Sequence, residues 1–349
     1  MSARSFQTRN AGARWRRLLA SAVMGMVAAA ASTANAADTQ TANAASGPVV
    51  ANAANAPIPA MMAEHASSGL LLGVVNTGSH LVAVGGNGVI VLSEDGVHWT
   101  QVQMPVDVTL TGVSFADDQH GWAVGHDAVI LYTADGGRSW HIQSYQPALD
   151  SPLFAVLAID AQKVLAVGAF GLMEITDDGG LHWNKVDAPD MVNDKLHLNG
   201  ITRLADGQLL VVGENSLAGV SADGLHWQRL TLPYDGSLFG ALPWGDHGAI
   251  AYGLRGNIFM TADVHGGQWQ PIEVATTNSF FGGFKLPSGE AVIVGGDSRV
   301  VRIDTSGKSH VMPSNPDKVG QSGSLAAGIF YKDKLLMVGE SGVAHAALQ

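Results

Sequence analysis

The segment TADGGRSW (Thr133 to Trp140) is the strongest indication of the fold, because close variants of it recur along the chain. The other copies are SEDGVHW (Ser93 to Trp99), TDDGGLHW (Thr176 to Trp183), SADGLHW (Ser221 to Trp227) and TADVHGGQW (Thr261 to Trp269), with a decayed sixth from Asp304 to His310. The copies close at positions 99, 140, 183, 227, 269 and 310, which are 41 to 44 apart. So regular a period indicates a repeat protein.

Each copy follows the same succession of short apolar runs. One run ends in Val-Gly, as in Leu81 to Gly85, and after a few loop residues a second run leads into the copy. A further run comes earlier, as in Leu110 to Phe115, and a short segment such as Gln101-Val102 follows the tryptophan. Four short strands in about 42 residues, separated by Gly, Asp and Asn turns, are typical of a propeller blade. The sequence therefore predicts an all-β propeller of four-stranded antiparallel blades.

The number of blades depends on the end of the chain. From Leu325 onward a seventh copy supplies three strands and stops where a fourth is due. We expect seven blades, with the segment Ile58 to Met62 as a possible fourth strand that closes the ring; six blades is the alternative. The expected parts are a signal peptide at 1–36, a low-complexity tether at 37–68, and repeats at 69–105, 106–148, 149–190, 191–233, 234–275, 276–313 and 314–349.

The repeated motif is expected to be structural. Its aspartates suit a tight turn, where a carboxylate accepts backbone N–H bonds, and its tryptophans suit the core beside that turn. Gly137 and Gly180 provide the positive φ that such a turn requires. Histidines 98, 182 and 226 precede the tryptophan in separate blades, too far apart to ligate one ion, so no metal or other cofactor is expected. The structural residues are Asp95, Trp99, Asp135, Trp140, Asp178, Trp183, Asp223, Trp227, Asp263 and Trp269.

The loops between the second and third strands of the blades are the expected binding rim, on the face opposite the motif. Polar loop residues on a rigid frame are where binding functions concentrate, although ordinary solvated turns have the same composition. His126 and Asp127 resemble a general-base pair, but no nucleophile lies near them in sequence, so no catalytic residue is assigned. The expected rim residues are Asn87, His126, Asp127, Phe170, Glu214, Arg255, Asp297, Arg299 and Glu340.

The N-terminus reads as an export signal. Five arginines precede an apolar run from Leu18 to about Ala31, which ends in Ala34-Asn35-Ala36. The run is shorter than the roughly 20 residues of a membrane-spanning helix, so cleavage is expected rather than anchoring. Without these five arginines the chain has 14 basic and 30 acidic residues, a formal charge of −16. We expect an exported, periplasmic or secreted monomer with no membrane insertion after cleavage.

Composition excludes several classes of protein. The 349 residues include no cysteine, which removes disulfide scaffolds, thiol catalysis, iron–sulfur clusters and thiolate zinc sites. An acidic chain without basic clusters is a poor match to nucleic acid. A hydrophobic share of 46% with 14% charged residues excludes a disordered chain.

One phrase carries a family resemblance. Gly121-Trp122-Ala123-Val124-Gly125, followed by Ile130 to Trp140, resembles the photosystem II assembly and stability factors, which are seven-bladed Asp-box propellers. The resemblance covers about Leu70 to Ala346 and implies a non-catalytic scaffold that docks on membrane-protein subunits. It also implies an arginine-rich docking patch, whereas only six arginines follow residue 36. We therefore expect a non-photosynthetic bacterial relative that serves another envelope complex.

Two other functions compete with a scaffold. A sialidase-like glycoside hydrolase shares the Asp-box, but the chain has no Arg-Ile-Pro motif, and Arg302-Ile303-Asp304 is the nearest match. No acid and nucleophile pair is evident in the sequence, so the protein is expected not to be an enzyme. A glycan- or small-ligand-binding propeller is the third hypothesis, with Phe170 and Trp244 as stacking residues.

Overall fold

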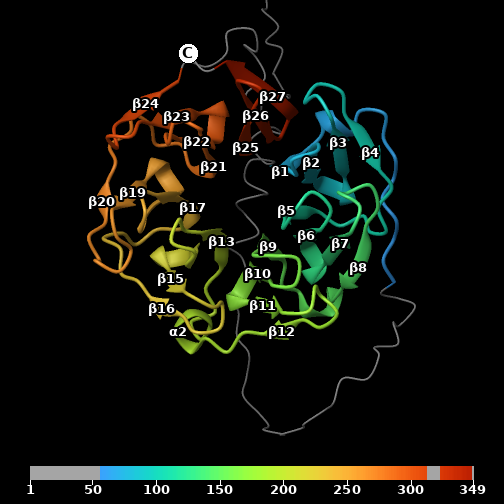
Figure 1. Cartoon of the computed structure of the whole chain (residues 1–349), viewed down its shortest axis with the longest axis horizontal. Helices are drawn as coiled ribbons and strands as arrows, with labels where there is room; N and C mark the ends of the chain where they lie inside the picture. The colour runs from blue at the N-terminus through green and yellow to red at the C-terminus, as the bar shows by residue number, and fades with distance from the viewer. Residues whose placement is uncertain (1–55, 313–322, 348–349) are drawn as a thin grey trace, which may run out of the picture. The chain divides into compact units, whose positions relative to one another are not determined.

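The computed structural model describes residues 56–312 and 323–347, which form a ring of seven antiparallel sheets (Figure 1). In every sheet the strands follow one another in chain order, so each sheet is a propeller blade of consecutive hairpins. The predicted all-β propeller is confirmed, with seven blades rather than six. The predicted signal peptide and most of the tether lie outside the described residues. Within the described ranges, no helix is long and apolar enough to cross a membrane.

The first strand of each blade lies nearest the axis of the ring. Each first strand packs against the first strands of both neighbouring blades, and β25 packs against β1, which closes the circle (Figure 1). Small residues permit this approach, since a Cβ added at Gly282 would lie 2.2 Å from the carbonyl oxygen of Ala326 in the next blade. The first strands are β1 (Leu71–Asn76), β5 (Leu110–Phe115), β9 (Leu153–Ala158), β13 (Leu198–Arg203), β17 (Leu238–Trp244), β21 (Phe280–Lys285) and β25 (Leu325–Tyr331).

The second and third strands form the buried centre of each blade. All of them except β27 of blade 7 have a strand on either side, and another blade lies against each face, which explains continuous apolar runs such as the one in β2. The second strands are β2 (Leu81–Gly85), β6 (Gly121–Gly125), β10 (Val164–Gly168), β14 (Leu209–Gly213), β18 (Gly248–Gly253), β22 (Ala291–Gly295) and β26 (Lys334–Gly339). The third strands are β3 (Ile90–Ser93), β7 (Ile130–Thr133), β11 (Met173–Thr176), β15 (Ala218–Ser221), β19 (Ile258–Thr261), β23 (Val300–Ile303) and β27 (Gly342–Ala347).

Six blades have a fourth strand at the periphery of the ring (Figure 1). These strands are short, and short edge strands limit pairing with other chains. They are β4 (Thr100–Val102), β8 (His141–Ser144), β12 (Asn184–Lys185), β16 (Gln228–Arg229), β20 (Gln270–Pro271) and β24 (Ser309–Val311).

The seventh blade has three strands among the described residues, and the segment Ile58 to Met62 does not supply a fourth. This part of the sequence prediction is wrong. The segment forms no strand and lies against the first blade, where the Ala60 N–H donates to the carbonyl oxygen of Met104 (3.1 Å). Pro57 and Pro59 give the physical reason. They lack an N–H at two alternate positions, and alternate residues of a strand face the same neighbour.

Packing between the first and last blades closes the ring instead. Leu71 of blade 1 shares a hydrophobic cluster with Leu336 and Val338 of blade 7. The Tyr331 hydroxyl also crosses this seam and donates to the carbonyl oxygen of Glu94 (2.8 Å). The seam is therefore held by side-chain burial in the same way as the other contacts between blades.

Candidate functional site

Each Asp-box aspartate is held inside its own turn. In blade 2 the Asp135 carboxylate accepts hydrogen bonds from the Ser139 N–H (2.9 Å) and the Thr133 hydroxyl (2.8 Å). The Thr133 hydroxyl oxygen accepts from the Gly137 N–H (2.9 Å), and the Trp140 indole donates to the Gly137 carbonyl (2.9 Å). The motif is thus a closed local network that joins the third strand to the fourth.

Copies of different length all form a turn at the aspartate, although they do not keep every bond of the blade 2 network. In the shorter blade 1 copy the Ser93 hydroxyl oxygen accepts from the Gly96 N–H (2.8 Å), one residue earlier than in blade 2. The longer blade 5 copy has lost the tryptophan bond, because the Trp269 indole N–H has no partner among the described residues. Gly137 and Gly180 have φ values of +92° and +89°. A turn tolerates these changes of length, which an array of reacting groups would not.

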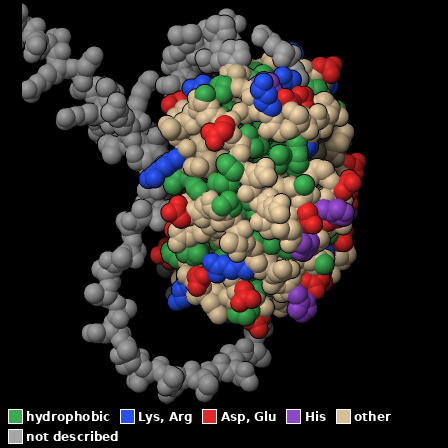
Figure 2. Space-filling view, turned by 90° about the vertical axis from the view of Figure 1, so that its left-hand side faces the viewer, with side chains coloured by type: hydrophobic (Ala, Val, Ile, Leu, Met, Phe, Trp, Pro, Cys, Tyr) green, Lys and Arg blue, Asp and Glu red, His purple; other side chains and the backbone are tan. Residues whose placement is uncertain are grey.

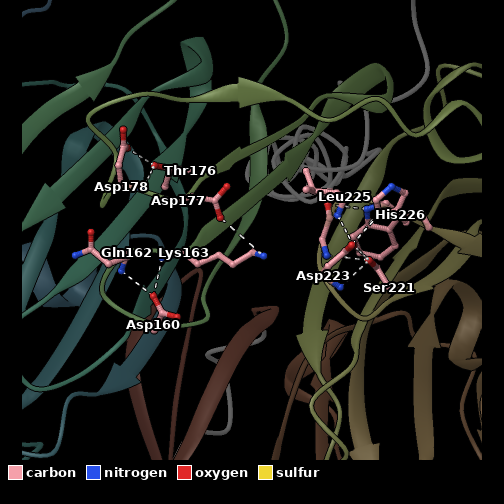
Figure 3. Close-up of polar contacts among 12 residues, drawn as sticks. Asp160, Gln162, Lys163, Thr176, Asp177, Asp178, Ser221, Asp223, Leu225 and His226 are labelled. Atoms are coloured by element: carbon pink, nitrogen blue, oxygen red, sulfur yellow. Dashed lines mark hydrogen bonds and ion pairs between the residues drawn. The ribbon is translucent and has the colours of Figure 1, made fainter.

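The histidines before the tryptophans bind the aspartates of their own copies. The Nδ1 atoms of His98, His182 and His226 lie 2.6, 2.7 and 2.7 Å from the respective Oδ2 atoms, the last of them shown in Figure 3. The bond from the His98 side chain holds the pKa of Asp95 well below its usual range. No three His, Asp or Glu side chains of the described residues are grouped to hold a metal ion.

A second set of turn carboxylates, not singled out from the sequence, follows the first strands. Asp117 accepts from the N–H groups of Gln119 (2.8 Å) and His120 (2.7 Å). Asp160 makes the equivalent bonds to Gln162 (2.8 Å) and Lys163 (2.7 Å), as Figure 3 shows. The local signal is Asp-x-Gln, present at Asp117, Asp160 and Asp206. We call the side with these turns and the Asp-boxes the Asp-box face; Figure 2 shows histidine and acidic side chains gathered toward one side of the ring.

The rim loops lie on the other face and share one backbone conformation. Each is a single 3-10 turn whose middle residue is left-handed: η4 (Gly86–Gly88), η5 (His126–Ala128), η7 (Ala169–Gly171), η8 (Glu214–Ser216), η9 (Leu254–Gly256) and η10 (Gly296–Ser298). The left-handed residues are Asn87 (φ 54°), Asp127 (58°), Phe170 (54°), Asn215 (53°), Arg255 (58°) and Asp297 (53°). Asn and Asp tolerate this conformation, whereas Phe and Arg are rarely found in it.

The backbone of each rim loop is tied to the connection that leads into the next blade. The Gly88 N–H donates to the Val108 carbonyl (2.8 Å), and the Ser298 N–H donates to the Gly323 carbonyl (2.8 Å). These bonds fix the loops, while the side chains of the left-handed residues extend from them. The rim is therefore a rigid frame that presents one variable side chain for each of six blades.

Two arginines, Arg255 and Arg299, belong to the rim of blades 5 and 6. Neither Arg255 nor Arg299 takes part in an ion pair among the described residues. The Nε of Arg299 is buried and has no hydrogen-bond partner there. Nearby Asp297 accepts instead from the Asn278 amide (3.2 Å). Blades 5 and 6 thus present two guanidinium groups on the same face.

The other predicted rim residues share this face without forming one cluster. The Asp127 carboxylate accepts from the Tyr145 hydroxyl (3.2 Å), and Glu214 accepts from the His197 N–H (3.2 Å). His126 is half-buried, while Asn87 and Glu340 are exposed. The residues therefore lie dispersed around the ring and do not form one compact centre.

The two residues proposed for ligand stacking lie on opposite faces. Phe170 belongs to the rim loop of blade 3 and is 52% exposed. Trp244 ends β17 in a hairpin on the Asp-box face, where the Lys285 ammonium lies 4.2 Å from the ring centroid. They cannot contact one ligand.

An aromatic patch on the rim was missed from the sequence. We give this name to Phe154, Phe170 and His197, where the His197 ring lies 4.9 Å from Phe170 and 5.7 Å from Phe154. One sequence feature could have indicated the patch. An aromatic residue comes directly after the first residue of β9, and the same position is aromatic in β17 and β21. Phe239 and Phe281 occupy it there, with ring centroids 5.6 Å apart.

The described residues line two shallow hollows, one on the rim face and one on the Asp-box face. One, of about 450 Å³, is lined by Asp194, Leu196, Asn215, Arg229, Tyr234 and Asp235 on the rim face. The other, of about 430 Å³, is lined by His80, Leu92, Ser93, Glu94, Asp95, His98, Thr100 and Arg138 on the Asp-box face. Arg229 pairs with Asp194 at 2.7 Å in the first, and Asp95 is held in its turn in the second. The charged groups of Asp194, Arg229 and Asp95 are thus engaged in structural contacts.

The fold and its two faces define the class of protein, a seven-bladed propeller of Asp-box repeats with a rim of rigid loops. Residues 93–343 match the family model PSII_BNR, described as photosynthesis system II assembly factor YCF48. The chain belongs to this family, which confirms the resemblance seen in the sequence.

Individual relatives agree with this assignment. The chain is 24% identical over 234 residues to the chloroplastic photosystem II stability/assembly factor HCF136 of Cyanidioschyzon merolae, covering 51% of this chain and 52% of that protein. It is 31% identical over 90 residues to the photosystem II assembly lipoprotein Ycf48 of a Synechococcus species, covering 25% of this chain and 27% of the relative. The chain thus spans about half or less of the length of these curated relatives.

A solved structure titled YCF48 bound to D1 peptide shares the fold, with a TM-score of 0.64 and 18% identity. It covers 81% of this chain and 94% of the other. The protein is therefore a propeller of the assembly-factor type, and its named relatives are assembly factors rather than enzymes.

Proposed function

We propose that the protein is an exported, non-catalytic scaffold that docks on a membrane-protein subunit of an envelope complex through its rim face. The proposal depends on one observation, the contrast between the backbone and the side chains of the rim. Its backbone is fixed by hydrogen bonds to the next blade, while the side chains of Arg255 and Arg299 have no ion-pair partner among the described residues. A rigid frame with uncompensated charge suits recognition of another protein, because little ordering is required on binding.

The family supports the proposal. A relative has been solved with D1 peptide bound, and other relatives are named as photosystem II assembly factors. We extend to this chain the role of an assembly factor that binds a membrane-protein subunit. The formal charge of −16 after residue 36, with only six arginines, favours a complex other than photosystem II.

The state of the polar groups supports a non-catalytic role. The aspartates of the Asp-box face serve as acceptors within turns, and Asp127 binds a tyrosine hydroxyl instead of activating a nucleophile. Export is supported by the basic, apolar and Ala-Asn-Ala succession at the N-terminus. A signal peptide of this kind would place the scaffold where it meets exported domains of membrane proteins.

Affinity capture from detergent-solubilised envelopes tests the rim. The variant Arg255→Glu with Arg299→Glu reverses both rim charges and is expected to reduce capture of the partner at least tenfold. The matched control, Arg138→Glu with Lys308→Glu, reverses two charges in Asp-box turns and should leave capture unchanged. Equal capture by both double variants would refute the assignment of the rim as the partner-binding surface. Turnover of a fluorogenic sialoside by the purified protein would refute the non-catalytic role.

A further inference from the structure

We propose that the aromatic patch is the docking point for an extended apolar peptide segment flanked by basic residues. This inference rests on the proposed scaffold function and adds the chemistry of the segment that the scaffold recognises. It concerns Phe154, Phe170 and His197 on blades 3 and 4, away from the two rim arginines on blades 5 and 6.

Phe170 is the most exposed member of the patch and has the least favourable backbone. Its φ is 54° and 52% of its surface is accessible. A bulky side chain in the left-handed region is less stable than glycine there, and the part of the ring that faces water gains no burial in return. An apolar side chain at such a position is explained when a partner covers it.

The rest of the patch holds this ring in place. The Phe170 N–H donates to Nδ1 of His197 (3.1 Å), and the His197 N–H donates to the Glu214 carboxylate (3.2 Å). The His197 ring meets Phe170 at 71° and Phe154 at 79°, both edge-to-face. His197 is only 5% exposed and is thus fixed between two partly exposed rings. A partner would find a preformed aromatic surface with little to reorganise.

The surrounding charge indicates which apolar segment would bind. The helix α2 (Pro189–Val192) packs against the loop that carries Phe170, and Asp190 in α2 and Asp187 just before it are exposed. Glu214 adds a third carboxylate, while Asp194 is offset by Arg229 (2.7 Å). Lys195 is the single exposed cation of the connection that has no ion pair among the described residues. The charge beside the patch is therefore net negative and favours basic flanks on the partner.

A second aromatic pair occupies the equivalent position of the first strands in blades 5 and 6, separated from the patch by Asn199 of blade 4. Each first strand has a register irregularity after its first residue, and in blades 3, 5 and 6 the residue at that point is Phe154, Phe239 or Phe281. All three are partly exposed. An extended segment can therefore contact more than one blade, which suits a peptide better than a single small ligand.

Fluorescence anisotropy with three labelled peptides tests the inference. All have twelve residues: a Leu, Phe and Val core flanked by two lysines at each end, the same core with glutamate flanks, and lysine flanks around a core of Ser and Asn. We expect the first peptide to bind at least tenfold more tightly than either of the others. Equal affinity of the three, or no binding of the first, would overturn the proposal.

The decisive variant is Phe170→Gly, because glycine suits a φ of 54° and the fold should be as stable as before or more so. We expect about tenfold weaker binding of the lysine-flanked apolar peptide with an unchanged or higher unfolding midpoint. Phe170→Asn, which also tolerates this backbone, should weaken binding equally. The control is Leu181→Ser, an exposed aliphatic residue on the Asp-box face, which should bind as the wild type does. If Phe170→Gly binds the lysine-flanked apolar peptide as tightly as the wild type does, the aromatic patch is not the docking point.

The two proposals fail separately. If the peptides show no preference but envelope capture still depends on Arg255 and Arg299, the patch is refuted and the scaffold function stands. If peptide binding depends on Phe170 but capture does not respond to the arginine variant, the rim assignment in the proposed function is refuted and the patch stands.

Discussion

The Asp-box face and the rim face are built from loops of the same blades, but they use their polar groups in opposite ways. On the Asp-box face the side chains are engaged, as when Asp135 accepts bonds from Thr133 and Ser139 within one turn. On the rim the backbone is engaged, as when Gly88 donates to Val108 of the next connection. The side chains of Arg255 and Phe170, which complete no turn by a hydrogen bond, belong to the rim.

This difference separates stability from binding. Residues that complete a turn are needed for the fold, so their replacement should act on the free energy of unfolding. Residues that extend from a turn already completed by the backbone should tolerate replacement and affect binding alone. If the rim binds the partner as proposed, each blade has its structural role at one end and its recognition role at the other.

The largest expected effect is on the turn carboxylates. Asp135→Ala removes the acceptor for a backbone N–H and two hydroxyl groups, and should lower the free energy of unfolding by about 2 kcal/mol. Glu340→Ala on the rim, an exposed residue, should change it by less than about 0.5 kcal/mol. Urea unfolding with linear extrapolation measures both. Similar losses for the two variants would break the distinction between the faces.

Left-handed positions sharpen the comparison. Gly137→Ala should cost about 1–2 kcal/mol, because φ is +92° and the new Cβ would lie 3.3 Å from a methyl group of Val82. Arg255→Gly on the rim should leave the free energy of unfolding unchanged or raise it by up to about 1 kcal/mol, since glycine suits its φ of 58°. Thermal unfolding distinguishes the two. A marked loss from Arg255→Gly would mean that the rim side chain also serves the fold.

The smallest effect concerns pH, where the turn carboxylates contrast with a carboxyl group between blades. Hydrogen bonds from the backbone and side chain of His182 hold the pKa of Asp178 well below its usual range. Its contribution is present above the unfolded pKa, about 3.9, and is lost as the pH falls through the lower folded value. Burial raises the pKa of Glu174, which is 4% exposed, so its ionised form destabilises the fold at neutral pH and this penalty fades as the pH falls.

Glu174→Gln is therefore expected to increase stability at pH 7.5 by about 1 kcal/mol and to have little effect at pH 3, where the Glu174 side chain is neutral in both the folded and the unfolded state. Asp178→Asn should behave in the opposite way, destabilising at neutral pH and converging with the wild type in acid. Unfolding midpoints measured from pH 3 to 8 test both slopes. A Glu174→Gln variant that is less stable at pH 7.5 would show that the carboxylate is satisfied in the folded state.

Much of the fold and part of the site could be predicted, for reasons visible in particular residues. Asp135, Gly137 and Trp140 lie within one turn. Hydrogen bonds between residues so close in the chain can be predicted from the local sequence. The rim loops were located because the strands around them alternate in a fixed order. The contacts between rim side chains could not be predicted, because Phe154, Phe170 and His197 come from two blades and meet only in the folded ring.

The repeat, the turn that ends each third strand and the family resemblance follow from the sequence alone. Each of these depends on neighbours a few residues apart or on a period that can be counted. The folded ring is needed to establish seven blades rather than six, to place Ile58 to Met62 along blade 1, and to show that Arg255 and Arg299 form no ion pair among the described residues. Such outcomes depend on how blades some forty residues apart pack together, and the direction of a side chain across that interface is fixed only when the ring closes.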